Sequence, residues 1–433
     1  MTAAPAASSA LPAPDQAPRP SLWRNGPYMS LLTGETVAAV GQQVAQIAMP
    51  IVAVTYLVAT EMEIGVLNAI PGLAFLFLSL PIGAWVDRVS RRKVMIGANL
   101  VRAAVMAAVP ALWWAGALSV HWLMVLALVV GVAQVYFDMS YMSMVPSLVD
   151  RDQLDDANSR LQITAETART AGPGLGGLLA KVVSAPVLPL VTAVGYLVSA
   201  IAIWRIPRDE APAPREGSRL VAEMREGVTF VFRNVYIRPV VVATTASNLF
   251  STIGMTMVPV LLLRELGLGS FQFGLLMTAA SIGGVLGALA APRFSRLFGQ
   301  GHAIPVTYLL EAVAFLGMPL SFLLPRPGAI ALIAASQILG FFSIVAFNVV
   351  QVSMRQRQCP PRMIGRMTAA IRTLIWGVGP LGALASGVLA THLGLGATFT
   401  IAATGNLAGV VLLIRSPLWR LRSVPDPEWL ART

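Results

Sequence analysis

AMPIVAVTYLVATEMEIG, residues 48–65, recurs in the second half of the chain as MVPVLLLRELGLGSFQFG, residues 257–274. The proline and the glycine of the first stretch return with the same spacing at an offset of 209 residues. FDMSYMSM, residues 137–144, matches FNVVQVSM, residues 347–354, at an offset of 210. Two matches at nearly one offset indicate an internal duplication.

A third match links the two halves through a Gly-Pro pair inside apolar sequence. TARTAGPGLGGLLA, residues 167–180, and WGVGPLGALASGVLA, residues 376–390, carry this pair at an offset of 207. The first stretch alone has additional paired glycines. Three matches predict two repeats of six helices in the same orientation. Parallel repeats of this kind place a binding site near the membrane midplane, between the halves.

The composition is typical of a membrane protein. Hydrophobic residues make up 56% and charged residues 12% of the 433 residues, whereas about 25% of an average soluble domain is charged. Apolar stretches of about 20 residues, enough to span a bilayer, recur twelve times. We therefore predict an all-α integral membrane protein with twelve transmembrane helices. Its expected parts are a disordered cytoplasmic tail over 1–25, six-helix bundles over 26–206 and 239–415, a cytoplasmic linker with an amphipathic helix over 207–238, and a cytoplasmic tail over 416–433.

Lysine and arginine residues set the expected orientation. An N-terminus inside the cell leaves only Lys181, Arg264 and Arg326 in outer loops, a strong positive-inside bias that accounts for the formal charge of +11. A nucleic-acid-binding protein gathers its charge on one folded face, so nucleic acid is not an expected partner. The single cysteine, Cys359, excludes an intrachain disulfide framework. Without catalytic or metal-binding motifs, we expect no enzyme and no metal.

The turn between the second and third spans reads GAWVDRVSRRK, residues 83–93. Gly83 allows close helix approach, and Asp87 is placed to cap or pair with a neighbouring helix start. The basic cluster of Arg88, Arg91 and Arg92 suits anionic headgroups. The alternative is a turn that is basic only because it faces the cytoplasm.

A second motif lies in the fifth span. Ala168, Gly172 and Gly176 are four residues apart and form a flat helix face of the small-xxx-small kind. Pro173 interrupts the helical hydrogen bonds, so a bend is expected there. We assign Gly172, Pro173, Gly176 and Gly177 a conformational role and not a binding role.

These features together resemble the major facilitator superfamily. The turn is similar to the family's loop signature, and ARTAGPGLGG, residues 168–177, resembles its antiporter signature with Ala168 in place of the first glycine. AEMREGVTFVFRN, residues 222–234, resembles the loop before the seventh span in drug exporters related to macrolide and siderophore efflux proteins. The resemblance implies the major facilitator fold and a drug:proton antiporter. One departure is Gln134, since many such antiporters carry an arginine in the fourth span.

Two carboxyl groups are candidates for proton coupling, Asp138 and Glu35, because the resemblance places the first and fourth spans at the central cavity. Asp138 is replaced in the repeat by Asn348, which has a similar shape but does not titrate. Burial disfavours the ionised form of a carboxyl group, so these groups are able to bind and release a proton. An ion pair of Asp138 with Arg102 or with a neighbouring span is an equal alternative. The proton gradient is then the energy source, and no cofactor is expected.

Other charged residues within the spans are expected to be structural, because such charges are usually paired. Glu166 and Arg169 lie three residues apart and can neutralise each other. Arg102 and Glu311 fall on the third and ninth spans, which the resemblance makes outer scaffold helices. We expect pairing or snorkelling there, not substrate contact.

Polar and aromatic residues on the expected cavity-lining spans are candidates for substrate contact. They are Gln42, Gln46, Phe137, Tyr141, Asn248, Gln337, Asn348 and Trp376. The polar side chains among them would serve equally as hydrogen bonds between helices. A cavity with few fixed charges suits a lipophilic or weakly polar compound.

The expected function is secondary active efflux by alternating access. An antibiotic, another drug or a siderophore-like metabolite leaves the cell in exchange for protons. The expected partners are this lipophilic molecule, protons and membrane lipids. We expect a multi-pass monomer in the plasma membrane with both termini in the cytoplasm. A nutrient symporter or uniporter of the same fold, and a membrane sensor that transports nothing, are the alternatives.

Overall fold

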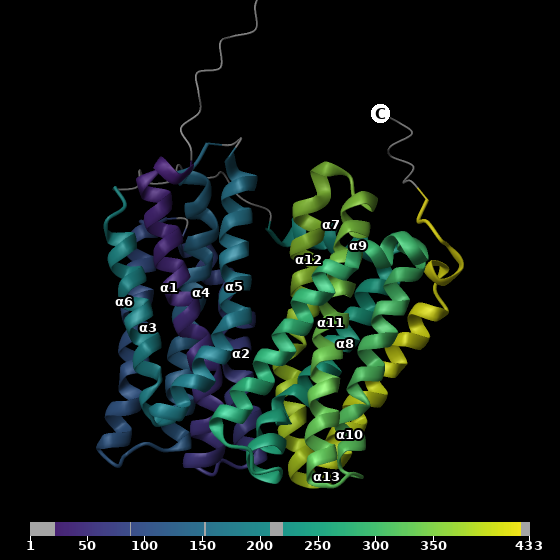
Figure 1. Ribbon diagram of the computed structural model, residues 1–433. Helices are drawn as coiled ribbons and strands as arrows, with labels where there is room; N and C mark the ends of the chain where they lie inside the picture. The colour runs from purple at the N-terminus through teal and green to yellow at the C-terminus, as the bar shows by residue number, and fades with distance from the viewer. Residues whose placement is uncertain (1–21, 87, 151–152, 208–219, 426–433) are drawn as a thin grey trace, which may run out of the picture.

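The computed structural model describes residues 22–86, 88–150, 153–207 and 220–425. All regular structure in these ranges is helical. Figure 1 shows the helices as two bundles side by side, one from each half of the chain. The all-α fold class predicted from the sequence is confirmed.

The first bundle consists of six long helices and short connecting turns. They are η1 (Leu22–Arg24), α1 (Gly26–Ile51), η2 (Val52–Tyr56), α2 (Glu61–Val86), α3 (Arg91–Trp114), α4 (Val120–Leu148), α5 (Leu154–Val182), η4 (Ala185–Val187) and α6 (Pro189–Trp204). Asn25 caps α1, because its side chain accepts a hydrogen bond from the Tyr28 N–H at 3.1 Å. The Asn25 amide also donates to the Leu148 carbonyl at 2.7 Å, which ties the start of α1 to the end of α4.

The second bundle contains two long helices that reverse direction at a glycine. Its elements are α8 (Ile237–Pro259), η5 (Val260–Glu265), α9 (Ser270–Phe315), α10 (Gly317–Ser321), α11 (Arg326–Gln358), η6 (Pro361–Met363), α12 (Ile364–Gly377), α13 (Gly379–Ile414) and η7 (Pro417–Arg420). Gly299 in α9 has φ +76° and Gly394 in α13 has φ +81°. This left-handed conformation is open to glycine without the cost that a side chain imposes.

Ten helical segments of the described chain are long and apolar enough to cross a membrane. α5 is not among them, because its first half, LDDANSRLQITAETART, is polar. The 51-residue segment 364–414 counts once although the chain reverses within it at Gly394. The protein is therefore multi-pass, and the number twelve stays a prediction that depends on α5 and on this reversal.

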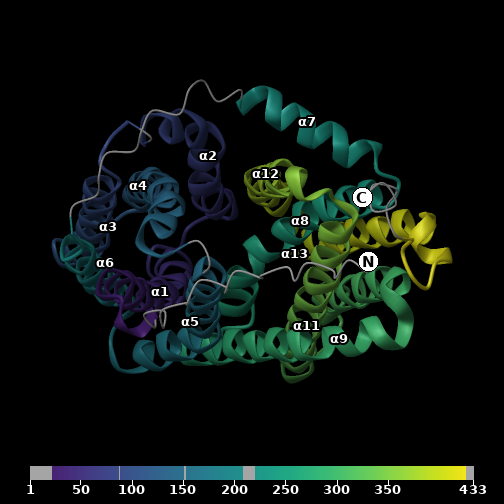
Figure 2. The same cartoon turned by 90° about the horizontal axis from the view of Figure 1, so that it is seen from above.

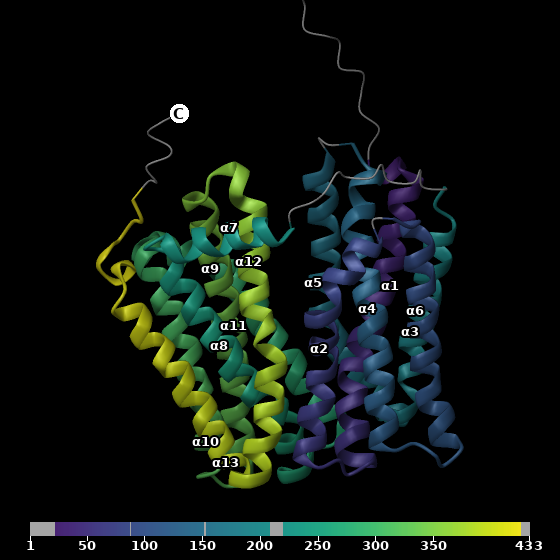
Figure 3. The same cartoon turned by 180° about the vertical axis from the view of Figure 1, so that it is seen from behind.

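The two ends of the molecule differ in how closely the bundles approach. α1 begins and α13 finishes at the top of Figure 1, where α7 also lies, and we name this the terminal end. α1 is followed by α2 at the opposite end, which we name the distal end. Figures 1 and 3 show the ribbons of the two bundles meeting at the distal end and diverging toward the terminal end.

The duplication seen in the sequence is visible in the backbone. After Pro50, the helix widens into a π turn in which the Leu57 N–H donates to the Val52 carbonyl at 3.0 Å. After Pro259, the Leu266 N–H donates to the Leu261 carbonyl at 2.9 Å. Each proline lacks the N–H needed for the regular ladder. Both distortions recur at the offset of 209 that the sequence predicts.

Glycine contacts join the bundles at two repeat-related places. α5 crosses α9 where a Cβ added at Gly177 would lie 2.7 Å from the Gly274 Cα atom. α2 crosses α13 where a Cβ added at Gly65 would lie 2.9 Å from the Gly387 Cα atom. Figure 2 shows α9 reaching across from the second bundle to the side of α5. Backbone thus meets backbone at both crossings, and no side chain fits between them.

These contacts correct the alignment of the Gly-Pro match. Gly172 packs against Gln43 of α1, and Gly382 packs against Thr252 of α8 at an equivalent place. Gly382, and not Gly379, therefore occupies the position of Gly172 in the second repeat. Gly387 likewise takes the position of Gly177, at an offset of 210. The shared Gly-Pro letters lie three residues out of register, so the second half also carries glycines at the packing positions of the motif.

The segment between the two bundles contains the helix α7 (Leu220–Arg233). Gly227 packs directly on the backbone of Arg366 in α12. Glu226 forms an ion pair with Arg366, and Val231 is fully buried. α7 is therefore fastened to the second bundle at the terminal end.

The glycine crossing generates a first prediction. We expect Gly177→Ala to lower the thermal unfolding temperature of the detergent-solubilised protein, because the new methyl group meets the α9 backbone, an overpacking that costs about 1–3 kcal/mol. Gly97→Ala in α3 is the control, since nothing lies within 4 Å of an added Cβ there. That change gains about 0.5–1 kcal/mol of helix stability. Equal melting temperatures for the two variants would contradict the crossing.

Candidate functional site

A central cavity of about 700 Å³ lies between the two bundles. Gln42, Gln46 and Gln134 line it from the first bundle, and Met255 and Phe273 line it from the second. Polar amides therefore face a largely apolar wall across the space. This arrangement suits a ligand with an apolar body and a few hydrogen-bonding groups.

A second space, which we name the side cavity, has a volume of about 900 Å³. Its walls come from α5, α8, α9, α10 and α11, and they extend to Ser353, close to the terminal end of α11. Arg169, Met255, Ser281 and Phe341 line both cavities. The two spaces therefore adjoin and together extend from between the bundles toward the terminal end.

An ion pair connects the two bundles at the distal end. The Arg264 guanidinium, in η5, lies 2.9 Å from the Glu61 carboxylate at the start of α2. Arg264 also donates to the Ala59 carbonyl. Both side chains are half-buried, so water screens the pair less than a fully exposed one. With the glycine crossings, this contact holds the distal end together.

Glu35 is held by a chain of hydrogen bonds inside the first bundle. Its carboxylate accepts from the Ser199 hydroxyl at 2.9 Å, and Ser199 accepts from the Asn99 amide at 2.8 Å. Arg102 donates to the Asn99 side-chain oxygen at 3.0 Å. This chain, which we name the polar relay, links α1, α3 and α6. Glu35 lines neither the central nor the side cavity.

Arg102 explains the position of Phe137. Its guanidinium lies 3.9 Å from the centre of the Tyr196 ring and 5.0 Å from the centre of the Phe137 ring. Such cation–π contacts offset part of the cost of burying the charge. Phe137 is 3% exposed and stacks on Tyr141 at 5.9 Å between ring centres. Both rings thus belong to the core of the first bundle and line neither of the two cavities.

Asp138 lies one hydrogen bond away from the central cavity. Its carboxylate accepts from the Gln134 amide at 2.8 Å, and Gln134 lines that cavity. Among the described residues, no basic side chain forms an ion pair with Asp138. The expected alternative, a pair with Arg102, is not seen. Gln134, where the resemblance leads one to expect an arginine, therefore has a contact of its own with the candidate acid.

The antiporter signature faces in two directions. Gly176 packs on Val44 and Ile47 of α1, within its own bundle, as Gly172 does on Gln43. Gly174 and Gly177 instead face α9 of the other bundle, close to Thr278 and Gly274. Pro173 lies at the wall of the central cavity. Because glycine has no side chain, the same stretch of α5 packs closely on α1 and on α9.

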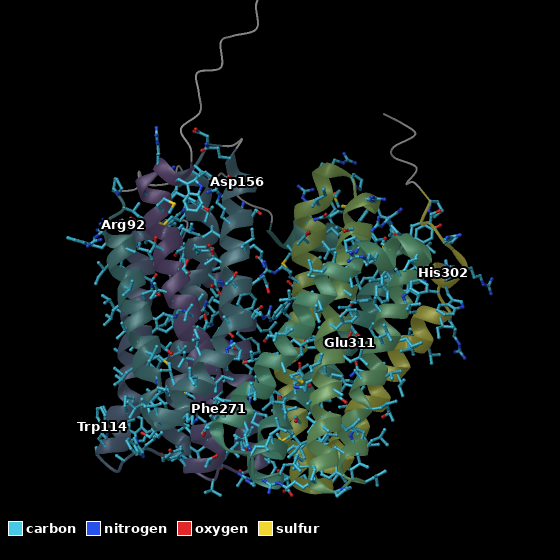
Figure 4. All side chains as sticks on the ribbon, viewed as in Figure 1. Arg92, Trp114, Asp156, Phe271, His302 and Glu311 are labelled. Atoms are coloured by element: carbon cyan, nitrogen blue, oxygen red, sulfur yellow. The ribbon has the colours of Figure 1, made fainter. Side chains whose placement is uncertain are left out.

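The loop signature is visible in part. Asp87 lies outside the described residues. Arg92 donates to the carbonyl groups of Ile203, at 3.2 Å, and of Trp204, at the end of α6. Positive charge is favourable at a helix C-terminus, so Arg92 fastens α3 to α6, near the terminal end in Figure 4. Gly83 lies in ordinary contact distance of Met139 in α4, and Arg88 is exposed.

The candidates for substrate contact separate into three groups. Gln42 and Gln46 line the central cavity, and Gln337 and Asn348 line the side cavity. Asn248 and Trp376, like Phe137 and Tyr141, line neither. Trp376 is 64% exposed on α12. The expected pair of Glu166 and Arg169 is present on α5 at 3.8 Å.

Glu311 is the residue that the sequence reasoning assigned to the scaffold and that the structure places at a cavity wall. It is 3% exposed and accepts from the Ser247 hydroxyl at 2.8 Å. Figure 4 shows it about halfway along the second bundle. A signal was available, because Glu311 stands 209 residues after Arg102 and so replaces a basic residue by an acidic one in the repeat.

Comparison with known proteins agrees with this architecture. The profile of a major facilitator family described as "transmembrane secretion effector" matches residues 21–429. The chain belongs to this family. Its members are membrane transporters, which agrees with two helical bundles around a central cavity and with the absence of enzyme motifs from the sequence.

Two curated relatives are drug exporters by name. The multidrug efflux pump Tap of Mycolicibacterium fortuitum is 28% identical over 93% of this chain and 99% of its own length. Macrolide efflux protein A of Streptococcus pyogenes is 23% identical over 87% of this chain and 92% of its own. A bacterial ferroportin homologue, solved in its inward-facing state, aligns with TM-score 0.68 at 16% identity over 92% of this chain and 99% of that one. Its outward-facing state aligns with TM-score 0.57.

The distal ion pair generates a second prediction. In a Cys359→Ser background with Gln46→Cys in the central cavity, we expect Arg264→Ala to speed labelling by an impermeant maleimide from the distal side. Loss of the pair and of the carbonyl contact favours opening by about threefold to tenfold. Arg326→Ala is the control, because the Arg326 guanidinium donates to the Gly267 carbonyl, within its own bundle. Unchanged labelling in Arg264→Ala would contradict a closing role.

Proposed function

We propose that the protein is a secondary active exporter that moves a lipophilic small molecule, of the drug or siderophore-like class, out of the cell in exchange for protons. The observation that carries this proposal is the pair of adjoining cavities, which extends toward the terminal end while contacts close the distal end. The names of the relatives support export. The mixture of amides and apolar side chains at the walls supports a weakly polar substrate.

The proposed orientation places the terminal end in the cytoplasm and the protein, as a monomer, in the plasma membrane. Basic side chains gather at the terminal end, in the turn before α3, in and after α7, and at the end of α11. Lys181, Arg264 and Arg326 are the basic residues of the distal loops. Cytoplasmic loops carry such an excess of lysine and arginine. The cavities then load from the cytoplasm or the inner leaflet.

Orientation is tested with paired cysteines in the Cys359→Ser background. We expect an impermeant maleimide added to intact cells to label His392→Cys, at the distal end, and not Gly365→Cys, at the terminal end. Both positions are exposed. Everted vesicles serve as the control and should reverse the pattern. Labelling of Gly365→Cys in intact cells would overturn the proposed orientation.

The proposed proton carriers are Asp138 and Glu35. Asp138 reaches the central cavity through Gln134, so a proton has a short polar route between the carboxylate and the cavity. Glu35 connects through the polar relay to Arg102. One proton driven by about 100 mV supplies about 2.3 kcal/mol. Each unit of pH difference adds about 1.4 kcal/mol. For a neutral substrate exchanged one for one, both contributions together support a gradient of roughly 500-fold.

Alternation requires the distal contacts to separate while the terminal end closes. Gly177 and Gly274 meet without interlocking side chains, so no side chain has to withdraw for α5 and α9 to part at this point. Further along the two helices, the hydrogen bond from the Ser281 hydroxyl to the Arg169 carbonyl, at 3.4 Å, has to break. In the proposed cycle, two glycines of the antiporter signature, Gly174 and Gly177, therefore lie at the surface where the two bundles separate. The signature lies on α5, whose glycines contact both α1 and α9 of the opposite bundle.

Transport in everted vesicles tests the proposed function. With a panel of lipophilic antibiotics and an imposed pH gradient, we expect wild-type vesicles to accumulate at least one compound. Asp138→Asn should reduce gradient-driven accumulation about tenfold or more, because the amide cannot carry a proton. The matched control is Asp156→Asn on the α5 surface, where the aspartate pairs with Arg160. No accumulation by wild type across a broad panel would overturn export, and full activity of Asp138→Asn would remove its role.

A further inference from the structure

Glu311 is a buried carboxyl group whose only hydrogen-bond donor in the described structure is the Ser247 hydroxyl. It is 3% exposed and lines the side cavity. Among the described residues, no basic side chain forms an ion pair with it. A carboxylate buried in this way is costly unless a positive charge or further donors approach it. The side cavity is the space from which such a group can come.

Gln337 is a second buried polar group at the same wall. It is 4% exposed, and its amide nitrogen has no hydrogen-bond partner in the part of the chain that the structure describes. α11 crosses α9 where a Cβ added at Gly340 would lie 3.8 Å from the Ala314 Cβ atom. Gln337 and Glu311 each stand three residues before this crossing. Because these two helix segments run in opposite directions, the residues lie on opposite sides of the crossing, and both line the side cavity. An acceptor and a free donor therefore face one cavity from adjacent helices.

The remainder of the side cavity is adapted to an apolar body. Met255, Met318, Phe315 and Phe341 line it, and flexible methionine with aromatic side chains accommodates varied shapes. Its volume, about 900 Å³, is within the range of drug-sized ligand sites. An apolar pocket with a few convergent polar groups is the usual form of a small-molecule site.

The other charges at this cavity do not satisfy Glu311. Arg169 lines the cavity from α5, but it pairs with Glu166 at 3.8 Å and both side chains are more than half exposed. In the first bundle the repeat-related position carries Arg102, which the polar relay and two aromatic rings hold away from both cavities. At this repeat position the second bundle thus presents a buried negative group to the cavity, whereas the charged group of the first bundle faces neither cavity.

We propose that Glu311 and Gln337 form a binding site for a lipophilic cation, with the Glu311 carboxylate facing the positive group and the Gln337 amide N–H donating to an acceptor atom of the ligand. This inference rests on the proposed function and names the substrate class that the side cavity takes. Ser247 positions the carboxylate. Met255, Phe315 and Phe341 surround the apolar part of the ligand.

Binding to the purified full-length protein in detergent tests the site. The probes are tetraphenylphosphonium, a lipophilic cation without acceptor atoms, and chloramphenicol, a neutral molecule with several. We expect wild type to bind both. Glu311→Gln should weaken tetraphenylphosphonium binding about tenfold or more, as loss of an interaction with a charged group does, and leave chloramphenicol within twofold. Gln337→Leu should show the reverse preference, with chloramphenicol weakened about threefold to tenfold.

Glu166→Gln is the matched control, because this acid lines the same cavity but is exposed and paired. It should leave both affinities within twofold. A wild type that binds no tetraphenylphosphonium would overturn the site, and so would a Glu311→Gln variant with unchanged affinity for it. Glu311→Asp keeps the charge and should retain binding.

A second measurement does not depend on how well Glu311→Gln folds. In the Cys359→Ser background, Ser251→Cys places a thiol at the side-cavity wall. We expect tetraphenylphosphonium to slow maleimide labelling of this thiol several-fold, and unchanged labelling would overturn the site. Binding needs no gradient and no transport. Glu311-dependent binding without movement in vesicles would therefore keep the site and reject the exporter, whereas export without Glu311-dependent binding would do the opposite.

Discussion

The two crossings at which glycine backbones meet, Gly177 with Gly274 and Gly65 with Gly387, determine the form of this molecule. They bring the bundles together at the distal end, where the Arg264–Glu61 pair adds an electrostatic contact. The bundles diverge from there, so the cavities between them extend toward the terminal end. At the two glycine pairs backbone meets backbone, so the bundles are able to separate there without withdrawing a side chain from between them.

The two repeats share this scaffold but differ in their chemistry. The π turns, the glycine crossings and the buried Phe137 and Phe347 recur at offsets of 209 or 210. The charged residues inside the spans do not recur, although Arg205 at the end of α6 returns as Arg415 at the end of α13. Glu311 stands in the second repeat at the position that Arg102 has in the first. Arg102 is a buried positive charge within the core of the first bundle, whereas Glu311 is a buried negative charge at a cavity wall of the second. The two repeats therefore share the backbone positions that packing requires, whereas their charged side chains inside the spans differ.

The fold was predictable from the sequence because periodic apolar stretches and the repeat of Pro50 at Pro259 depend on local chemistry. The Gly-Pro match was misaligned, since identical letters three residues out of register look the same without the partner helix that Gly382 contacts. Gln42 and Gln46 line the central cavity, whereas Phe137 lies in the core of the first bundle, where its ring contacts the Arg102 guanidinium from α3. The pattern of residues along one helix does not reveal such partners on another helix.

The positions of the carboxyl groups constrain how exchange can work. Asp138 and Glu35 lie in the first bundle. Asp138 is hydrogen-bonded to Gln134, and Glu35 belongs to the polar relay. Glu311 lies in the second bundle, at the wall of the side cavity. In the proposed cycle, a proton and a cation therefore bind to different groups on different bundles, so direct competition for one carboxylate does not couple them. Coupling must pass through the relative movement of the bundles. α5 is the helix able to carry it, since its glycines contact α1 on one face and α9 on the other.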